Sequence, residues 1–137
     1  MYVRHKNIIA IRSQCMISDA LFSLMKRRPF GQITVTEICE EAAIGRKTFY
    51  RNFELREDII EFQLDRILEE YAEEIAKLPK EQYLQYHFSF IQKKCDCFIL
   101  LYRQGFSSMV YEKFSVLLPY TMPLWSEDPV EQEYRSA

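Results

Sequence analysis

The sequence of 137 residues contains few of the features on which catalysis, metal binding or membrane insertion depends. Its two histidines, His5 and His87, form no Ser/His/Asp constellation by spacing, so we do not expect an enzyme. Three glycines provide no Gly-rich phosphate loop. There is no signal-peptide-like N-terminus and no apolar run of about 20 residues. We therefore expect a cytoplasmic protein with no membrane partner.

The four cysteines stand at no spacing that is typical of a metal site or a disulfide framework. Cys95 and Cys97 are two positions apart, and the nearest histidine, His87, lies eight residues before Cys95. Reduced, partly buried thiols are the favoured interpretation, and a zinc site is the less favoured alternative. We predict no metal and no cofactor.

The distribution of charge separates the chain into two halves, although its overall net charge is only −2. Residues 1–60 carry ten Lys/Arg and seven Asp/Glu, a net of +3, and residues 61–137 carry eight and thirteen, a net of −5. Nearly half of the residues are hydrophobic, so the chain can bury a core. A basic front half joined to an acidic rear half indicates that only the front half meets a polyanion.

Helical periodicity dominates the sequence, which contains no internal repeat and no alternating strand pattern, so we predict an all-α fold. After a basic lead-in over residues 1–12, an apolar stripe predicts a helix that runs to about Arg28. Pro29 ends this helix after Lys26, Arg27 and Arg28. These three cations either complement the helix dipole or contact phosphate, and the sequence does not decide between the two.

Residues 33–60 (ITVTEICEEAAIGRKTFYRNFELREDII) predict two short helices and the start of a long one. Thr34 and Glu37 fit a capping box before a helix from Val35 to about Ala42. The tripeptide Ala43-Ile44-Gly45 breaks that helix, and a second short helix spans residues 46–52. This is the pattern of a helix-turn-helix.

The second short helix has an apolar side and a basic side. Phe49 and Phe53 are four positions apart and face the core, whereas Tyr50 and Asn52 lie on the flanks. No acidic residue occurs from Gly45 to Phe53. Cations, hydroxyls and a phenol on one face suit contacts with phosphates and base edges in the major groove. The alternative is a solvated basic helix. The groups predicted to face outward are Lys47, Thr48 and Arg51.

Downstream, apolar residues at three-and-four spacing predict a long helix from Arg56 to Leu78, which Pro79 ends. Its acidic outer face is interpreted as solvated. Further helices are expected at about residues 81–94 and 96–104, with Gly105 as a cap, and at 106–118. Three prolines then interrupt the pattern, and the end of the chain is interpreted as a loop or tail.

The sequence of residues 33–60 resembles the DNA-binding signature of the TetR family of transcriptional regulators. The resemblance covers about residues 10–62 and is carried by Thr34-Val35, Ile38 and the cluster Thr48-Phe49-Tyr50 with Phe53. It implies a three-helix DNA-binding head, residues 1–54, and a helical ligand-binding and dimerisation domain, residues 55–137. The implied partners are double-stranded DNA, a second copy of the chain and a small-molecule effector. The positions that match DNA-contacting positions of the family are Thr34, Arg46, Lys47, Thr48, Tyr50, Arg51 and Arg56.

Two positions depart from the family pattern, and both lie at the turn. Ala43 stands where Gly is usual, so a residue with a Cβ must accept a positive φ. Gly45 stands where Ser or Thr often caps the recognition helix, so the side-chain cap is lost. Neither change removes a contacting group.

The rear half resembles the family only in layout. Candidate pocket residues are the aromatic and Met positions of the later helices, which spacing alone also allows to be core. Family members commonly end in two long helices that dimerise, and no room for them remains after Leu118. Truncation, a differently built dimer and a reduced pocket all remain open. The pocket candidates are Tyr71, Tyr86, Phe90, Phe98, Tyr102 and Met109.

These observations predict a dimeric, ligand-responsive transcriptional regulator that acts as a repressor on a palindromic operator. The alternative is a protein of the same fold that acts as a co-activator through protein contacts.

Overall fold

The computed structural model describes residues 2–115, which form six α-helices and no strand. The helices are α1 (Ile8–Met25), α2 (Val35–Ala42), α3 (Arg46–Asn52), α4 (Arg56–Ala76), α5 (Tyr83–Arg103) and α6 (Ser107–Ser115). Single 3-10 turns at Phe30–Gln32 and Lys80–Gln82 precede α2 and α5. The all-α prediction is confirmed.

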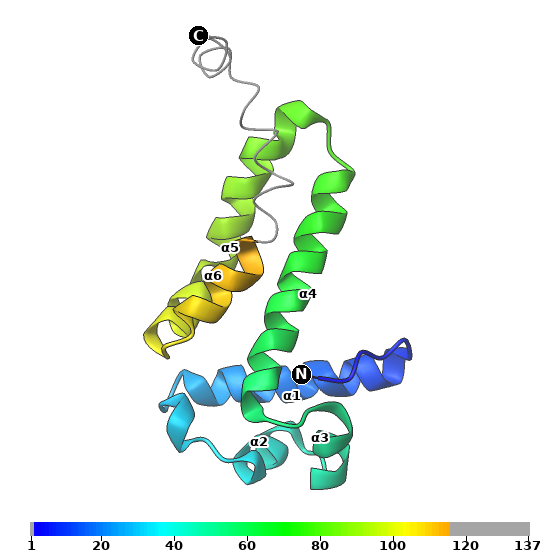
Figure 1. Ribbon diagram of the computed structural model, residues 1–137, viewed down its shortest axis with the longest axis vertical. Helices are drawn as coiled ribbons and strands as arrows, with labels where there is room; N and C mark the ends of the chain where they lie inside the picture. Colours follow the sequence, from blue (N-terminus) through cyan, green and yellow to red (C-terminus); the bar gives the residue numbers. More distant parts are fainter. Residues whose placement is uncertain (1, 116–137) are drawn as a thin grey trace.

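Helices α1, α2 and α3 form a small layer at one end of the molecule, and α4 rises from it (Figure 1). Ile17 and Leu21 of α1 are fully buried with Ile38 of α2, Phe49 of α3 and Leu64 of α4. By length and composition α1 could cross a membrane, but its apolar side is used in this core. Helix α1 ends at Met25, not at about Arg28, because Lys26 to Arg28 already lie in the turn before Pro29.

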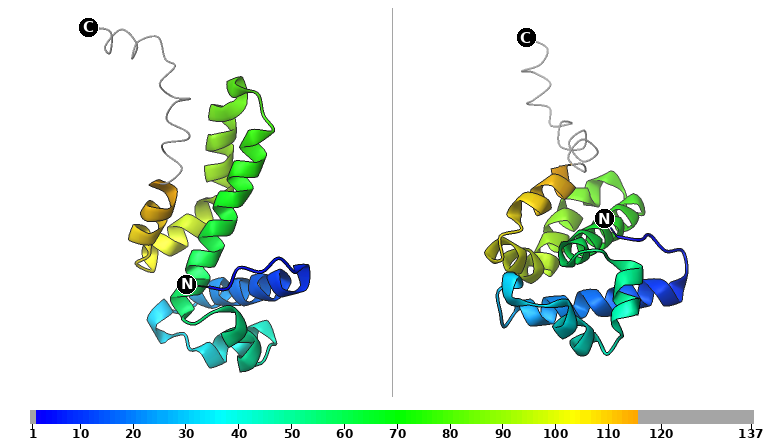
Figure 2. Two further views of the ribbon diagram at one scale, coloured as in Figure 1. Left: turned by 45° about the vertical axis from the view of Figure 1, so that its right-hand side comes forward. Right: turned by 60° about the horizontal axis from the view of Figure 1, so that its bottom comes forward.

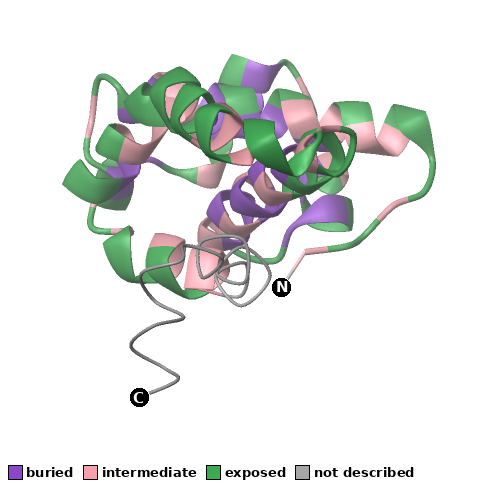
Figure 3. Ribbon diagram, turned by 90° about the horizontal axis from the view of Figure 1, so that it is seen from above, coloured by how far each residue is buried: buried purple, intermediate pink, exposed green. Residues whose placement is uncertain are grey.

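Helix α4 is the rod that the sequence predicts, and it ends at Ala76, two residues before the predicted end. Its first half belongs to the main core through Ile59, Ile60 and Leu64. Its second half contributes Ile67 and Tyr71 to a small separate cluster that includes Phe90 of α5. Figure 3 shows the buried residues in the middle of the molecule, with exposed residues on the outer faces of the helices.

Helix α5 is continuous, so the prediction of two helices over residues 81–104 is wrong. Nothing between Tyr83 and Arg103 breaks a helix, because this segment contains neither Pro nor Gly. Gly105 adopts a positive φ of 87° directly after the helix, as expected of a cap. The amide of Phe106 then bonds the carbonyl of Leu101 at 2.9 Å, which closes the helix end.

Helix α6 packs beside α4 and α5 (Figure 2). The Lys113 ammonium joins it to α4 through Asp65 at 2.9 Å and Glu61 at 3.3 Å. The predicted helix of residues 106–118 therefore corresponds to α6 as far as Ser115. Residues 116–118 and the proline-containing tail lie outside the described residues.

Candidate nucleic-acid interface

The turn between α2 and α3 is built as the sequence predicts, including its unusual alanine. The Thr34 hydroxyl accepts a hydrogen bond from the Glu37 amide at 3.2 Å and so caps α2. Ala43 adopts the left-handed conformation, with φ 56° and ψ 45°. The Ile44 amide returns to the carbonyl of Cys39 at 3.0 Å. This closure sets the direction in which α3 leaves the turn.

Helix α3 is held against the head by its two phenylalanines. Phe49 and Phe53 are buried, and their ring centroids lie 5.9 Å apart. Phe53 also packs edge to face on Phe62 of α4, at 5.6 Å. The assignment of these two side chains to the core is confirmed. The aromatic stack fixes the rotation of a helix that is only seven residues long.

The opposite side of α3 faces solvent. Arg46, Lys47 and Arg51 are exposed, Tyr50 is 53% exposed and Thr48 is half-buried. Within residues 2–115, no hydrogen bond or ion pair occupies the side chain of Lys47 or Arg51. Gly45 is the N-cap residue of α3 and provides no side-chain cap. The first amides of α3 therefore have no side-chain acceptor at the N-cap. This side of α3 therefore combines exposed cations with hydrogen-bond donors, and it carries no acidic side chain.

Asn52 does not lie on the flank of this surface, as the helical wheel predicted, but is buried. Its amide nitrogen donates to the carbonyl of Thr48 at 2.8 Å, and its oxygen lies 2.6 Å from Nε2 of His5. The segment before α1 runs past the end of α3, where the Val3 amide bonds the carbonyl of Asn52 at 3.0 Å. No sequence pattern indicated that residues 2–5 support the recognition helix.

Arg56 is placed differently from the phosphate-contacting position that it matches. Its Nη1 donates to the carbonyls of Phe30, at 2.8 Å, and Ile33. Its guanidinium also lies over the ring of Phe30, 4.6 Å from the centroid. Because this side chain is half-buried and directed inward, it joins the start of α4 to the turn before α2. A basic residue at a helix start does not reveal from sequence alone which of these roles it has.

The cations at the end of α1 also have partners inside the head. Arg27 pairs with Glu41 at 3.5 Å, and Arg28 pairs with Glu37. The Glu37 carboxylate thus pairs with Arg28. Among the described residues it accepts no hydrogen bond from the backbone amide of Thr34, which a complete capping box requires. The predicted capping box is therefore confirmed only for the hydroxyl of Thr34. These ion pairs hold the end of α1 against α2. They account for the positions of Arg27 and Arg28 without a contact to DNA.

Gln104, at the end of α5, joins the rear layer to the head. Its amide nitrogen donates to the carbonyls of Met25 at 3.0 Å and Arg28 at 3.3 Å, and its oxygen accepts from the Phe30 amide at 2.9 Å. Phe106 packs edge to face on Phe30 at 4.9 Å. Since Arg56 also contacts Phe30, the end of α5 and the start of α4 meet at this residue.

The six candidate pocket residues do not come together around one cavity. Tyr71, Tyr86 and Phe90 form an aromatic cluster with centroids 5.1 to 6.0 Å apart. Burial raises the pKa of Tyr71 and lowers the pKa of His87, whose Nδ1 lies 3.0 Å from the Tyr71 hydroxyl. Phe98, by contrast, packs on Phe114 of α6.

Met109 and Tyr102 complete the set, and neither joins the aromatic cluster. Met109 packs against the main core. Tyr102 is 72% exposed and faces solvent, so its assignment to a pocket is wrong.

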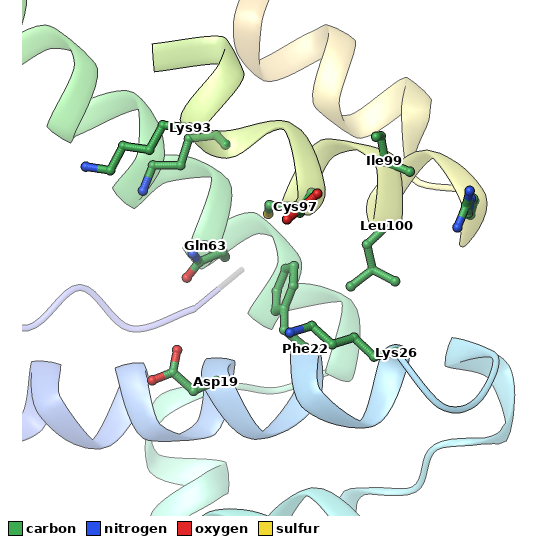
Figure 4. A pocket seen from close by; sticks show the side chains of 11 residues that line it. Asp19, Phe22, Lys26, Gln63, Lys93, Cys97, Ile99 and Leu100 are labelled. Carbon is green, nitrogen blue, oxygen red and sulfur yellow. The ribbon is translucent and has the colours of Figure 1, made fainter. Parts of the chain in front are cut away.

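A groove of about 550 Å³ instead lies between α1, α4 and α5, lined by none of these six residues. Asp19 and Phe22 approach it from α1, and Lys26 from the turn that follows α1. Gln63 approaches it from α4 and Lys93 from α5 (Figure 4). A second hollow of about 340 Å³ lies between Gln63, Lys94 and the acidic side of α4. Aromatic content did not predict these sites, because their linings are mixed polar and apolar.

The acidic face of α4 is not solvated throughout, as the sequence suggested, because Asp65 is buried. It accepts a hydrogen bond from the Tyr2 hydroxyl at 2.6 Å and pairs with Lys113 at 2.9 Å. Burial and the bond to Asp65 raise the pKa of Tyr2. Burial lowers the pKa of Lys113, but the bonds to Asp65 and Glu61 outweigh it, so that pKa is raised. Each group therefore keeps its proton.

Residues 17–61 match the family model described as bacterial regulatory proteins, tetR family. No curated protein and no solved structure matches the chain. The matched segment, about a third of the chain, runs from α1 through the turn and α3 into α4, and thus contains the whole surface described above. Over residues 17–61 the head is therefore similar to the tetR family of bacterial regulatory proteins, a family of DNA-binding transcription regulators.

Proposed function

We propose that the protein is a dimeric, ligand-responsive repressor that inserts α3 into the major groove of a palindromic operator. The observation that carries the proposal is the outward side of α3, where Lys47 and Arg51 are exposed and unpaired within the described residues. Phe49 and Phe53 hold the opposite side in the core. A seven-residue helix contacts few bases, so two copies related by a two-fold axis are needed for useful specificity.

Within this proposal the residues have distinct roles. Lys47 and Arg46 neutralise phosphates, and Arg51 is suited to bidentate contact with a guanine edge. Thr48 and the exposed hydroxyl of Tyr50 bond phosphate oxygens or base edges. The Thr34 hydroxyl, which already accepts a bond from Glu37, can still donate to a phosphate. Arg56 positions the turn through Phe30 and Ile33.

The rest of the proposal concerns control. Residues 1–54 act as the DNA-binding domain and residues 55–137 as the effector and dimerisation domain of a cytoplasmic protein. A small molecule in the groove between α1 and α5 would alter the position of α5. Gln104 would pass that change to α1 and Phe30. The effector thereby favours a spacing of the two heads that no longer fits successive major grooves.

A salt series tests DNA recognition. A preferred site is first selected from a random double-stranded library, and affinity is then measured between low and moderate salt. We expect log affinity to fall linearly with log salt, and Lys47→Ala to reduce the slope by about 1. Arg51→Ala should cost about 1–3 kcal/mol and relax the preference at one base pair.

The matched control is Lys77→Ala, which removes an exposed cation at the far end of α4. This variant should bind as the wild type does. A wild-type protein with no salt slope would contradict the proposal. A regulator that keeps its effect on a reporter gene after Lys47→Ala and Arg51→Ala would favour the co-activator alternative.

A further inference from the structure

Helix α5 carries an apolar stripe that nothing in the described part of the chain covers. Five of its six members are between 41% and 72% exposed, and the sixth, Cys95, is also exposed. The stripe runs almost the whole length of the helix. It consists of Leu84, Phe88, Ile91, Cys95, Ile99 and Tyr102.

The spacing of these residues is that of a helix-pairing seam. Successive members are three or four positions apart, which places all six within a sector of about 80° at 100° per residue. From Leu84 to Tyr102 the stripe is about 27 Å long at 1.5 Å per residue. Phe88, Cys95 and Tyr102 recur at intervals of seven, and Leu84 and Ile91 are also seven positions apart.

The edges of the stripe carry no unbalanced charge. Gln85 and Gln92 flank one side. Lys94, near the other side, is already paired with Glu70 of α4 at 3.0 Å. Lys93 projects from the opposite face by the same wheel, whereas Asp96 and Arg103, one acidic and one basic, lie on the side of Gln85 and Gln92. Two identical stripes can therefore meet with no net charge along either edge, whereas a strongly charged partner would find no complementary excess of charge.

The size of the stripe suits a dimer. Its members expose roughly 600 Å² per chain when large side chains count as about 150–250 Å² each. This is at the upper end of the apolar patches that monomers expose. Two copies would bury on the order of 1,200 Å² in total, the lower end of the range for stable interfaces.

We propose that the stripe on α5 is the dimer interface, formed by parallel pairing with α5 of a second copy. The direction rests on the proposed function, because both heads must reach one DNA duplex. Helix α5 runs toward the head, and α3 lies on the other side of α4 (Figure 1). Parallel pairing therefore places both heads at one end of the dimer, with α3 and the partner's α3 outward.

Parallel two-fold pairing brings each seam residue against its own copy. Phe88 meets the partner's Phe88, and Cys95 meets the partner's Cys95. An antiparallel pair would instead place Ile91 against the partner's Cys95 and would put the two heads at opposite ends. Cross-linking through cysteine separates these two arrangements.

The first experiment is mild oxidation of the wild type, followed by non-reducing electrophoresis. We expect a disulfide-linked dimer that Cys95→Ser abolishes. The double variant Ile91→Cys with Cys95→Ser should restore the cross-link, since position 91 also meets its own copy in a parallel pair. Antiparallel pairing would give neither cross-link and would overturn the proposal.

The second experiment is sedimentation of Phe88→Glu, which places a charge in the middle of the seam. We expect its dimer dissociation constant to rise by about 100-fold or more, with unchanged thermal unfolding of the monomer because the side chain is exposed. The control is Ser89→Glu, which adds the same charge one position away, off the stripe, and should remain dimeric.

The outcomes separate the interface from the function. A monomeric wild type, as expected if residues 116–137 of the same chain covered the stripe, or a dimeric Phe88→Glu would overturn the interface. In either case half-site DNA binding that depends on Lys47 would persist. Conversely, cross-linking at Cys95 without any DNA binding would support the interface and contradict the proposed function.

Discussion

The head and the rear layer of this protein differ in how completely they are packed. Seven of the eighteen residues of α1 are buried, whereas α5 has only two buried residues in twenty-one, Phe90 and Leu101. One continuous cluster joins α1, α2, α3 and the first half of α4, and Leu101 is the buried residue that α5 contributes to it. The second cluster contains three buried residues, Ile67, Tyr71 and Phe90.

This difference indicates that the head is packed more completely than the rear layer, which retains surface for additional contacts. A buried core fixes the rotation of α3 and thus which of its side chains face solvent. A helix that is buried on one side only can shift at a lower free-energy cost than a helix that is packed into a core. The same sparse packing is compatible with the interface and the ligand response that we propose for α5.

Deletion of one aromatic ring in each region should expose this contrast most strongly. We expect Phe53→Ala to lower the free energy of unfolding by about 3–5 kcal/mol, because it empties a fully buried site beneath α3. Phe90→Ala should cost less, about 2–3 kcal/mol, because the small cluster around Tyr71 can collapse. Urea denaturation of both variants measures the difference.

DNA binding provides the second readout of this pair. It should be lost in Phe53→Ala, because α3 loses its anchor, and retained in Phe90→Ala. A larger loss of stability for Phe90→Ala would show that the rear layer, and not the head, holds the fold together.

The sequence predicted the head far better than the rear layer for a physical reason. In the head, local signals agree with tertiary packing: Thr34 caps α2, and Phe49 and Phe53 are four positions apart on one face. The bounds of α2 and α3 follow directly from these signals. Contacts between distant residues, such as those of Asn52 with His5 and Asp65 with Tyr2, left no such local signal.

In the rear layer, aromatic residues at helical spacing were compatible with a core, a pocket or an exposed seam. Tyr71 is core and Tyr102 is exposed, although the local sequence gives both the same pattern. Periodicity shows that residues share a face but not what covers that face. The break expected near Cys95 was wrong because no helix-breaking residue supports it.

Arg56→Lys should have the next largest effect, and it tests whether this residue belongs to the head's packing or to its DNA surface. Lysine keeps the charge but cannot reproduce the planar contact over Phe30 together with the bonds to two carbonyls. We expect the free energy of unfolding to fall by about 1–3 kcal/mol with an unchanged salt slope of DNA binding. Unchanged stability with altered DNA affinity would instead assign Arg56 to phosphate. Lys77→Ala is again the exposed control.

Ala43→Gly should produce a smaller change of the opposite sign, at the one strained point of the head. A residue with a Cβ loses about 1–2 kcal/mol in the left-handed conformation that Ala43 adopts. Glycine adopts it freely but loses about 0.5–1 kcal/mol more in chain entropy on folding. We therefore expect a net gain of about 0.5–1 kcal/mol in the free energy of unfolding, measured by urea denaturation. Because the turn keeps its shape, DNA affinity should not change. A loss of stability would mean that the turn relaxes in solution to a conformation in which alanine is unstrained.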